Sequence, residues 1–220
     1  MERIKSLHPL AGNNATSAAA LWKDPSAAAE GWDAEQAPWK EKRRRVCLPL
    51  TNRIRSLLEG MTGDACVVRL GVLLEHAPDT RNPVTWVDCL AISTFGVFAI
   101  DQYEWIGKVA RSANEEELLL HERPGVVCVQ TSPLRRAKPV LRHLRAVLGQ
   151  FLCPVESIAV FADSDCALDP TLPENMLQGG ELRHFMRTRL NRFRCSHSRY
   201  LDPRRIAAHL QSHSPDWGQG

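Results

Sequence analysis

The chain has 220 residues, 44% of them hydrophobic and 24% charged, and this composition excludes wholesale disorder. Its length suits one domain of ordinary size, with or without a tail. No apolar run approaches the roughly 20 residues that a membrane-spanning helix needs. Charged residues follow Met1 without an apolar core, so we expect no signal peptide, no membrane contact and a cytoplasmic location.

The cysteine pattern supports the same compartment. The seven cysteines are an odd number, and Cys66, Cys89, Cys128 and Cys153 lie in or beside apolar runs. This favours buried thiols in a reducing compartment over a disulfide framework. No two cysteines have C-x-x-C spacing, which gives a zinc ribbon or a redox pair no support.

Residues 1–45 differ from the rest of the chain. Ala, Ser, Asn, Gly and Pro dominate them without an apolar period, which predicts a weakly ordered segment that contributes little to stability. Trp22, Trp32 and Trp39 would dock either onto the protein's own core or onto a protein partner. A charged run over residues 40–45 marks the boundary. We expect the domain itself to span residues 46–212 and a tail to span residues 213–220.

In the globular part of the chain, the sequence pattern predicts helices and strands in mixed order. Apolar spacing and turn residues predict, in chain order, a helix over 51–61, a strand over 65–74, a loop over 78–83, a hairpin of strands 84–92 and 96–100, and a short strand over 126–130. A helix capped by Ser132, a buried strand over 157–162, a helix over 182–193 and a last helix after Asp202 follow. The fold class is therefore α/β (α+β), with a mixed central sheet and a β-hairpin core flanked by helices.

Two carboxylates stand out in the predicted hairpin. If it closes symmetrically about Thr94 and Phe95, Asp88 and Asp101 face each other with Cβ atoms roughly 5 Å apart. Like charges there destabilise a sheet unless a positive charge lies between them, and a divalent cation would supply it. The alternative is that each aspartate is an ordinary residue near a strand end.

The same hairpin resembles a known family. The stretch from Val87 to Asp101, with its Gly-Val-Phe turn, resembles the centre of the NERD (nuclease-related) domain of the PD-(D/E)XK nuclease-like superfamily. Further similar segments follow in order at residues 132–136, 157–161 and 172–177, so the resemblance covers about residues 50–210. It implies a restriction-endonuclease-like fold in which Asp88 and Asp101 bind Mg²⁺, activate water and cleave phosphodiesters.

Several site positions depart from the family pattern. Asp101 replaces a glutamate, and Tyr103 replaces the lysine that would stabilise charge in the transition state. Thr51 stands near the place of an upstream glutamate, and Ser132 and Arg136 replace an asparagine and a glutamine. Lys108 or Arg136 would have to supply the missing cation. We therefore predict a degenerate hydrolytic site with weak or absent activity, and leave open whether the protein is an enzyme.

Basic residues gather in two blocks. Residues 135–145 carry five basic groups without an acid, and residues 183–205 carry eight arginines and one aspartate. Such blocks bind nucleic-acid backbones or are solvated helix faces. The residues expected to bind nucleic acid, with DNA favoured over RNA, are Arg135, Arg136, Arg142, Arg187, Arg192 and Arg194. The alternative function is a non-catalytic interaction module that binds a protein partner.

Overall fold

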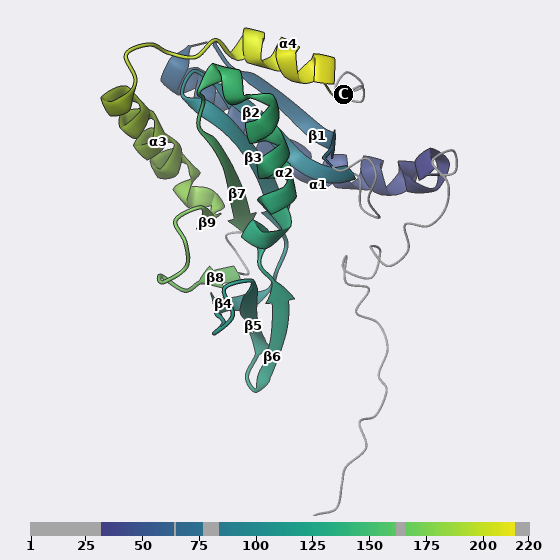
Figure 1. The fold of residues 1–220 in the computed structure, drawn as a ribbon. Helices are drawn as coiled ribbons and strands as arrows, with labels where there is room; N and C mark the ends of the chain where they lie inside the picture. The colour runs from purple at the N-terminus through teal and green to yellow at the C-terminus, as the bar shows by residue number, and fades with distance from the viewer. Residues whose placement is uncertain (1–31, 64, 77–83, 162–165, 214–220) are drawn as a thin grey trace, which may run out of the picture.

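The computed structural model describes residues 32–63, 65–76, 84–161 and 166–213 (Figure 1). Its larger sheet has the strand order β1-β2-β3-β7-β9. These strands are β1 (Val67–Glu75), β2 (Val84–Ser93), β3 (Gly96–Tyr103), β7 (Val155–Phe161) and β9 (Met176–Gln178). The first three are antiparallel neighbours, whereas β7 pairs parallel to β3 and β9 parallel to β7. The chain must therefore cross the sheet between β3 and β7.

A smaller sheet lies beyond one end of the larger one (Figure 1). Its order is β6-β5-β4-β8, from β4 (Gly107–Arg111), β5 (Glu117–Arg123), β6 (Val126–Thr131) and β8 (Cys166–Leu168). Gly125, with φ +80°, sits in the turn between β5 and β6. An aromatic cluster of Tyr103, Trp105 and Phe161 connects the two sheets, with ring centroids 5.4 Å apart.

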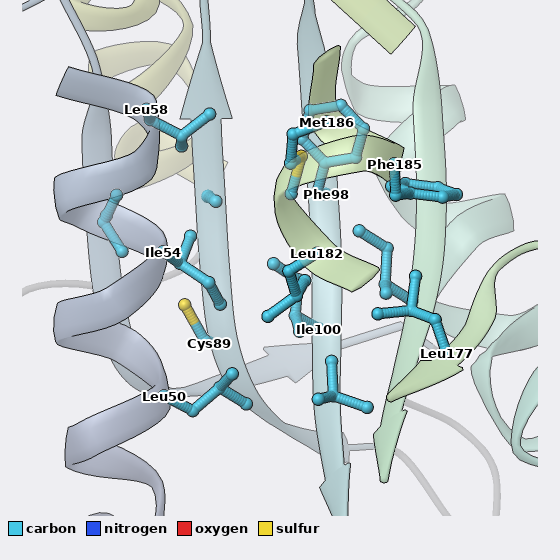
Figure 2. Close-up of a cluster of buried hydrophobic side chains, with 14 of the residues drawn as sticks. Leu50, Ile54, Leu58, Cys89, Phe98, Ile100, Leu177, Leu182, Phe185 and Met186 are labelled. Carbon is cyan, nitrogen blue, oxygen red and sulfur yellow. The ribbon is translucent and has the colours of Figure 1, made fainter. Parts of the chain in front are cut away.

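Helices cover both faces of the larger sheet (Figure 1). They are α1 (Trp32–Thr62), α2 (Pro133–Val147), α3 (Leu182–Ser196) and α4 (Pro203–His213), with short 3-10 helices at Gly149–Phe151 and Gly179–Glu181. α1 and α3 bury their apolar sides in the first core: Ile54 and Leu50 of α1 lie beside Cys89, and Met186 and Phe185 of α3 lie near Phe98 (Figure 2). α2 and α4 pack on the other face, where Val140, Leu144 and Ile206 form the second core with Leu90. The basic residues of α2 and those of α3 therefore lie on opposite faces of the sheet, whereas Arg204 and Arg205 of the second block belong to α4, on the α2 face.

Along β1 and β2, side chains alternate between the first core and the second core. This alternation shifts at Gly71 in β1 and at Asp88 in β2, and we call this position the crease. Val68 faces the first core, whereas Val72 faces the second, although their numbers have the same parity. Gly71 between them has φ +63°, a left-handed conformation that favours glycine. A Cβ atom at Gly71 would also lie 2.6 Å from the Trp86 ring. The crease therefore depends on a glycine, against which the Trp86 ring packs.

The predicted mixed α/β class is confirmed, and the hairpin, the strand at 155–161 and the last three helices lie close to their predicted places. Ser132 precedes α2 without a side-chain cap hydrogen bond, whereas Asp202 accepts bonds from the backbone of Arg204 and Arg205. β4 and β5 lie where we had predicted no strand. The loop predicted over residues 78–83 lies outside the described residues. In the described ranges, no helix is both long and apolar enough to cross a bilayer.

The first helix is the largest difference from the sequence prediction. α1 begins at Trp32 and runs through Pro38 and Pro49, so it crosses the domain boundary drawn at residue 45. Apolar spacing had predicted a start at Thr51. Proline inside a helix removes a backbone hydrogen bond and disfavours the helix by about 3 kcal/mol. Packing outweighs this penalty, because Cys47, Leu50 and Ile54 are buried against the sheet. Trp39 packs edge to face on Trp86, at 5.4 Å between ring centroids.

Candidate functional site

The hairpin brings Asp88 and Asp101 together with the predicted register. Cys89 pairs with Ile100 and Leu90 with Ala99, so Asp88 and Asp101 occupy the next position along the two strands. The Asp88 backbone N–H donates to Asp101 Oδ1 at 3.1 Å. The backbone N–H of Gln102 donates to Asp88 Oδ2 at 2.8 Å. Each carboxylate thus binds the backbone of the opposite strand.

Asp88 is a buried carboxylate whose countercharge comes from α1. Arg43 donates from Nε to Oδ1 at 2.8 Å and from Nη2 to Oδ2 at 2.5 Å, which makes the pair bidentate. The Trp86 indole also donates to Oδ1, at 2.9 Å. Together with Gln102, these donors give each oxygen of Asp88 two hydrogen bonds. The positive charge that we expected beside Asp88 is therefore supplied by an arginine.

The electrostatics around Arg43 stabilise this pair. Burial by itself would lower the pKa of Arg43, but the hydrogen bonds and charge of Asp88 outweigh it and raise that pKa above its usual value. Burial also raises the pKa of the neighbouring Cys47 thiol, and the negative charge of Asp88 adds to this effect. Cys47 therefore stays a neutral thiol beside the ion pair and is not an activated nucleophile.

Asp101 has a different environment from Asp88. Burial, followed by the nearby charge of Asp88, raises the pKa of Asp101 to about 7, against the opposing charges of Arg43 and Arg136. A narrow gap beside it, lined also by Tyr103, Leu134 and Ser157, has no room for a water molecule. Asp101 is therefore partly protonated near neutral pH. Of the two cations considered as substitutes for the missing lysine, Arg136 acts on Asp101, while Lys108 lies 3.8 Å from Asp169.

Tyr103 occupies the predicted lysine position but is part of the packing between the sheets. Its ring stacks on Phe161 at an interplanar angle of 27° and meets Trp105 edge to face. Burial raises the pKa of Tyr103, and the charge of Asp101 raises it further, so the phenol stays neutral. At the upstream glutamate position, Thr51 is fully buried and donates to the carbonyl of Cys47 at 3.0 Å. Neither side chain resembles the group that the family pattern would place there.

The donors around these residues do not fit a Mg²⁺ ion. Mg²⁺ needs carboxylate or carbonyl oxygens with free lone pairs and usually keeps several water molecules. Both Asp88 oxygens already accept hydrogen bonds from an arginine cation, and the gap at Asp101 is too narrow for water. Within the described ranges, no three His, Cys, Asp or Glu side chains are grouped as metal ligands.

The six arginines predicted to bind nucleic acid do not form one surface. Arg135 lies 3.0 Å from Glu116, and Arg192 lies 3.0 Å from Glu174, which also binds Arg189. The exposed Arg142 belongs to α2 and lies on the opposite face from α3.

One subset on α3 does form a continuous feature. Arg183, Arg187 and Arg194 are exposed and are spaced by four and seven residues, so they lie on one side of the helix. We call them the α3 arginine row. Arg189 and Arg192 lie on another side and are held by Glu174. Among the residues that the structure describes, no carboxylate forms an ion pair with the row.

Arg43 and Trp86 are the site residues that sequence reasoning missed. We had treated Arg43 only as part of a charged boundary. A signal was present, because the apolar spacing of Ile54 and Leu58 continues backward by steps of three and four through Leu50 and Cys47 to Arg43. Pro49 obscured it. Trp86 lies two residues before Asp88 in the same strand, where strand alternation places both side chains on one face, and its indole donates to that carboxylate.

Comparison with known proteins finds no protein similar to this chain. No family model matches the chain, and searches of curated proteins and of solved structures return no match.

Proposed function

We propose that this protein is a nucleic-acid-binding domain that does not itself hydrolyse phosphodiesters. The observation that carries the proposal is the α3 arginine row, three exposed guanidinium groups without a carboxylate partner in the described part of the chain. Arg183 and Arg194 are 11 positions apart, over which an α-helix rises about 16 Å. A row of that length can follow several successive phosphates of one strand. Binding of this kind reads charge and not base sequence.

The Arg43–Asp88 pair supports the absence of hydrolysis. Metal-dependent cleavage needs a cation that polarises the phosphodiester and a group that activates water. Here Asp88 is neutralised by Arg43, and Tyr103 cannot supply the positive charge expected from a lysine. Losing one preorganised electrostatic contact commonly slows a reaction on the order of 10²- to 10³-fold. We therefore expect binding without cleavage.

The binding part is tested by matched substitutions on one helix. We would measure anisotropy of labelled DNA at 50 to 200 mM salt for the native protein, Arg187→Gln and Arg192→Gln. Each variant loses one charge from α3, but only Arg187 belongs to the row. Arg187→Gln should weaken binding and reduce the slope of log affinity against log salt by about one. The charge of Arg192 is already paired with Glu174, so Arg192→Gln should change the affinity and the salt slope less than Arg187→Gln does.

The chemical part is tested by incubating DNA with Mg²⁺ or Mn²⁺ and the native protein, Tyr103→Lys or Asp88→Ala. We expect no cleavage by the native protein. Native cleavage that Asp88→Ala abolishes would overturn the non-hydrolytic assignment and indicate an enzyme. No binding to DNA or RNA at low salt would overturn the proposed function, and a protein partner would then be the remaining candidate.

A further inference from the structure

The segment that joins α3 to α4 borders an open groove of about 380 Å³. The turn that follows α2 forms the other wall, through Phe151 and Leu152. The groove is lined by Phe151, Leu152, Ser196, His197, Ser198, Arg199, Tyr200 and Leu201. Leu152 has a left-handed backbone, with φ +50°, and its side chain is 82% exposed at the rim.

Flat aromatic rings line this groove. The His197 ring lies parallel to the ring of Phe193, with 4.1 Å between centroids and an interplanar angle of 6°. Tyr200 is 56% exposed and also lies nearly parallel to Phe193, at 18° and 6.3 Å. Phe193 is buried in the first core, so it fixes the orientation of both exposed rings. Aromatic side chains exposed in this way stack with nucleobases, at about 1–3 kcal/mol per base.

Positive charge runs along α3 and into the groove. The α3 arginine row ends at Arg194, whose Nε donates to the hydroxyl of Tyr200 at 2.7 Å. Arg199 lines the groove itself and is exposed. The carboxylate of Asp202, the acidic residue nearest in sequence, accepts bonds from the backbone at the start of α4. The row and the rings are therefore one continuous surface, in which cations lead directly to aromatic side chains.

We propose that this groove binds single-stranded nucleic acid, with bases stacked on His197 and Tyr200 and phosphates along the α3 arginine row. The inference rests on the proposed function and names the form of nucleic acid that is bound. A duplex buries the faces of its bases and could use only the arginines. An acidic peptide would likewise use the charges and leave the ring faces without a partner. A single strand uses both parts of the surface.

The test compares three labelled probes: a 12-nucleotide oligothymidine, a duplex of the same length and a poly-glutamate peptide. Anisotropy would be measured for the native protein and for the double variant His197→Ala/Tyr200→Ala. Both rings are exposed, so the variant should keep its fold, which circular dichroism checks. We expect the double variant to bind oligothymidine at least tenfold more weakly, while duplex binding changes less than twofold. A charge variant, Arg183→Gln/Arg187→Gln, should weaken binding of both nucleic acids.

The remaining results separate a failure of the groove proposal from a failure of the proposed function. If the native protein binds nucleic acid and the ring variant binds oligothymidine equally well, the groove proposal is wrong and the proposed function stands. If the peptide binds tightly and displaces oligothymidine, the groove is a docking site for an acidic protein and the proposal is overturned. If neither nucleic acid binds at low salt, both proposals fail.

Discussion

The Arg43–Asp88 pair is the feature whose removal should be most visible in stability. Arg43→Met keeps much of the aliphatic stem but removes two hydrogen bonds to Asp88 and one to the carbonyl of Gln102. The Asp88 side chain is only 2% exposed, so water cannot replace the lost donors. Removing one partner of a buried ion pair commonly costs about 3–5 kcal/mol, because the other charge stays buried without compensation. We expect a loss in that range.

The same helix supplies the control. Arg45 pairs with Glu41 at 2.9 Å, but these side chains are 78% and 56% exposed. Exposed pairs contribute about 0–1 kcal/mol, so Arg45→Met should change the free energy of unfolding by no more than that. Both variants would be unfolded with urea at pH 7, and the midpoint and slope give the free energy.

A double-mutant cycle then isolates the pair. Asp88→Asn removes the negative charge, and in that background Arg43→Met should cost about 1–3 kcal/mol less than in the native protein. The reasoning is refuted if Arg43→Met is no more destabilising than Arg45→Met. It is also refuted if the two single effects simply add in the double variant.

Three further outcomes are expected. Because the pKa of Asp101 is raised to about 7 in the folded state, its contribution to stability is complete below about pH 4 and is lost as the pH rises through 7. In urea titrations, Asp101→Asn should therefore gain stability relative to the native protein between pH 5 and pH 8. A difference in stability that stays constant over this pH range would contradict the prediction. Gly71→Ala should lower the thermal midpoint strongly, whereas Gly60→Ala, with open space around its Cβ, should raise stability by about 0.5–1 kcal/mol. A Gly71→Ala variant more stable than Gly60→Ala would be inconsistent with the crease. Deleting residues 1–45 should lower the urea midpoint well below that of a 1–31 deletion, because only the longer deletion removes Trp39 and Arg43; equal midpoints would restore the boundary predicted at residue 45.

The hairpin shows how much of this molecule local pattern can predict. A tight turn between two apolar strands fixes the register, and the register alone places Asp88 opposite Asp101. The missed strand β5 carried a comparable signal, since Pro124-Gly125 marks a turn between two apolar segments. Local pattern was sufficient wherever the interacting residues were close in sequence.

The countercharge of Asp88 lay beyond local pattern. Arg43 is 45 residues from Asp88, and whether it reaches that carboxylate depends on a helix that continues through Pro49. The division of the α3 arginines into a paired and an unpaired set likewise depends on where the loop before β9 places Glu174. Composition identified the arginines, but only tertiary structure separates those with a carboxylate partner from those in the row.

The long separation between Arg43 and Asp88 also has a consequence for the order in which contacts form during folding. Asp101 is 13 residues from Asp88, whereas Arg43 is 45 residues away. Closing the longer loop costs about 1 kcal/mol more in chain entropy. We therefore expect the two carboxylates to meet when the hairpin closes, before the arginine that compensates Asp88 arrives. Docking of the first half of α1 would then supply the positive charge that Asp88 lacks in the isolated hairpin.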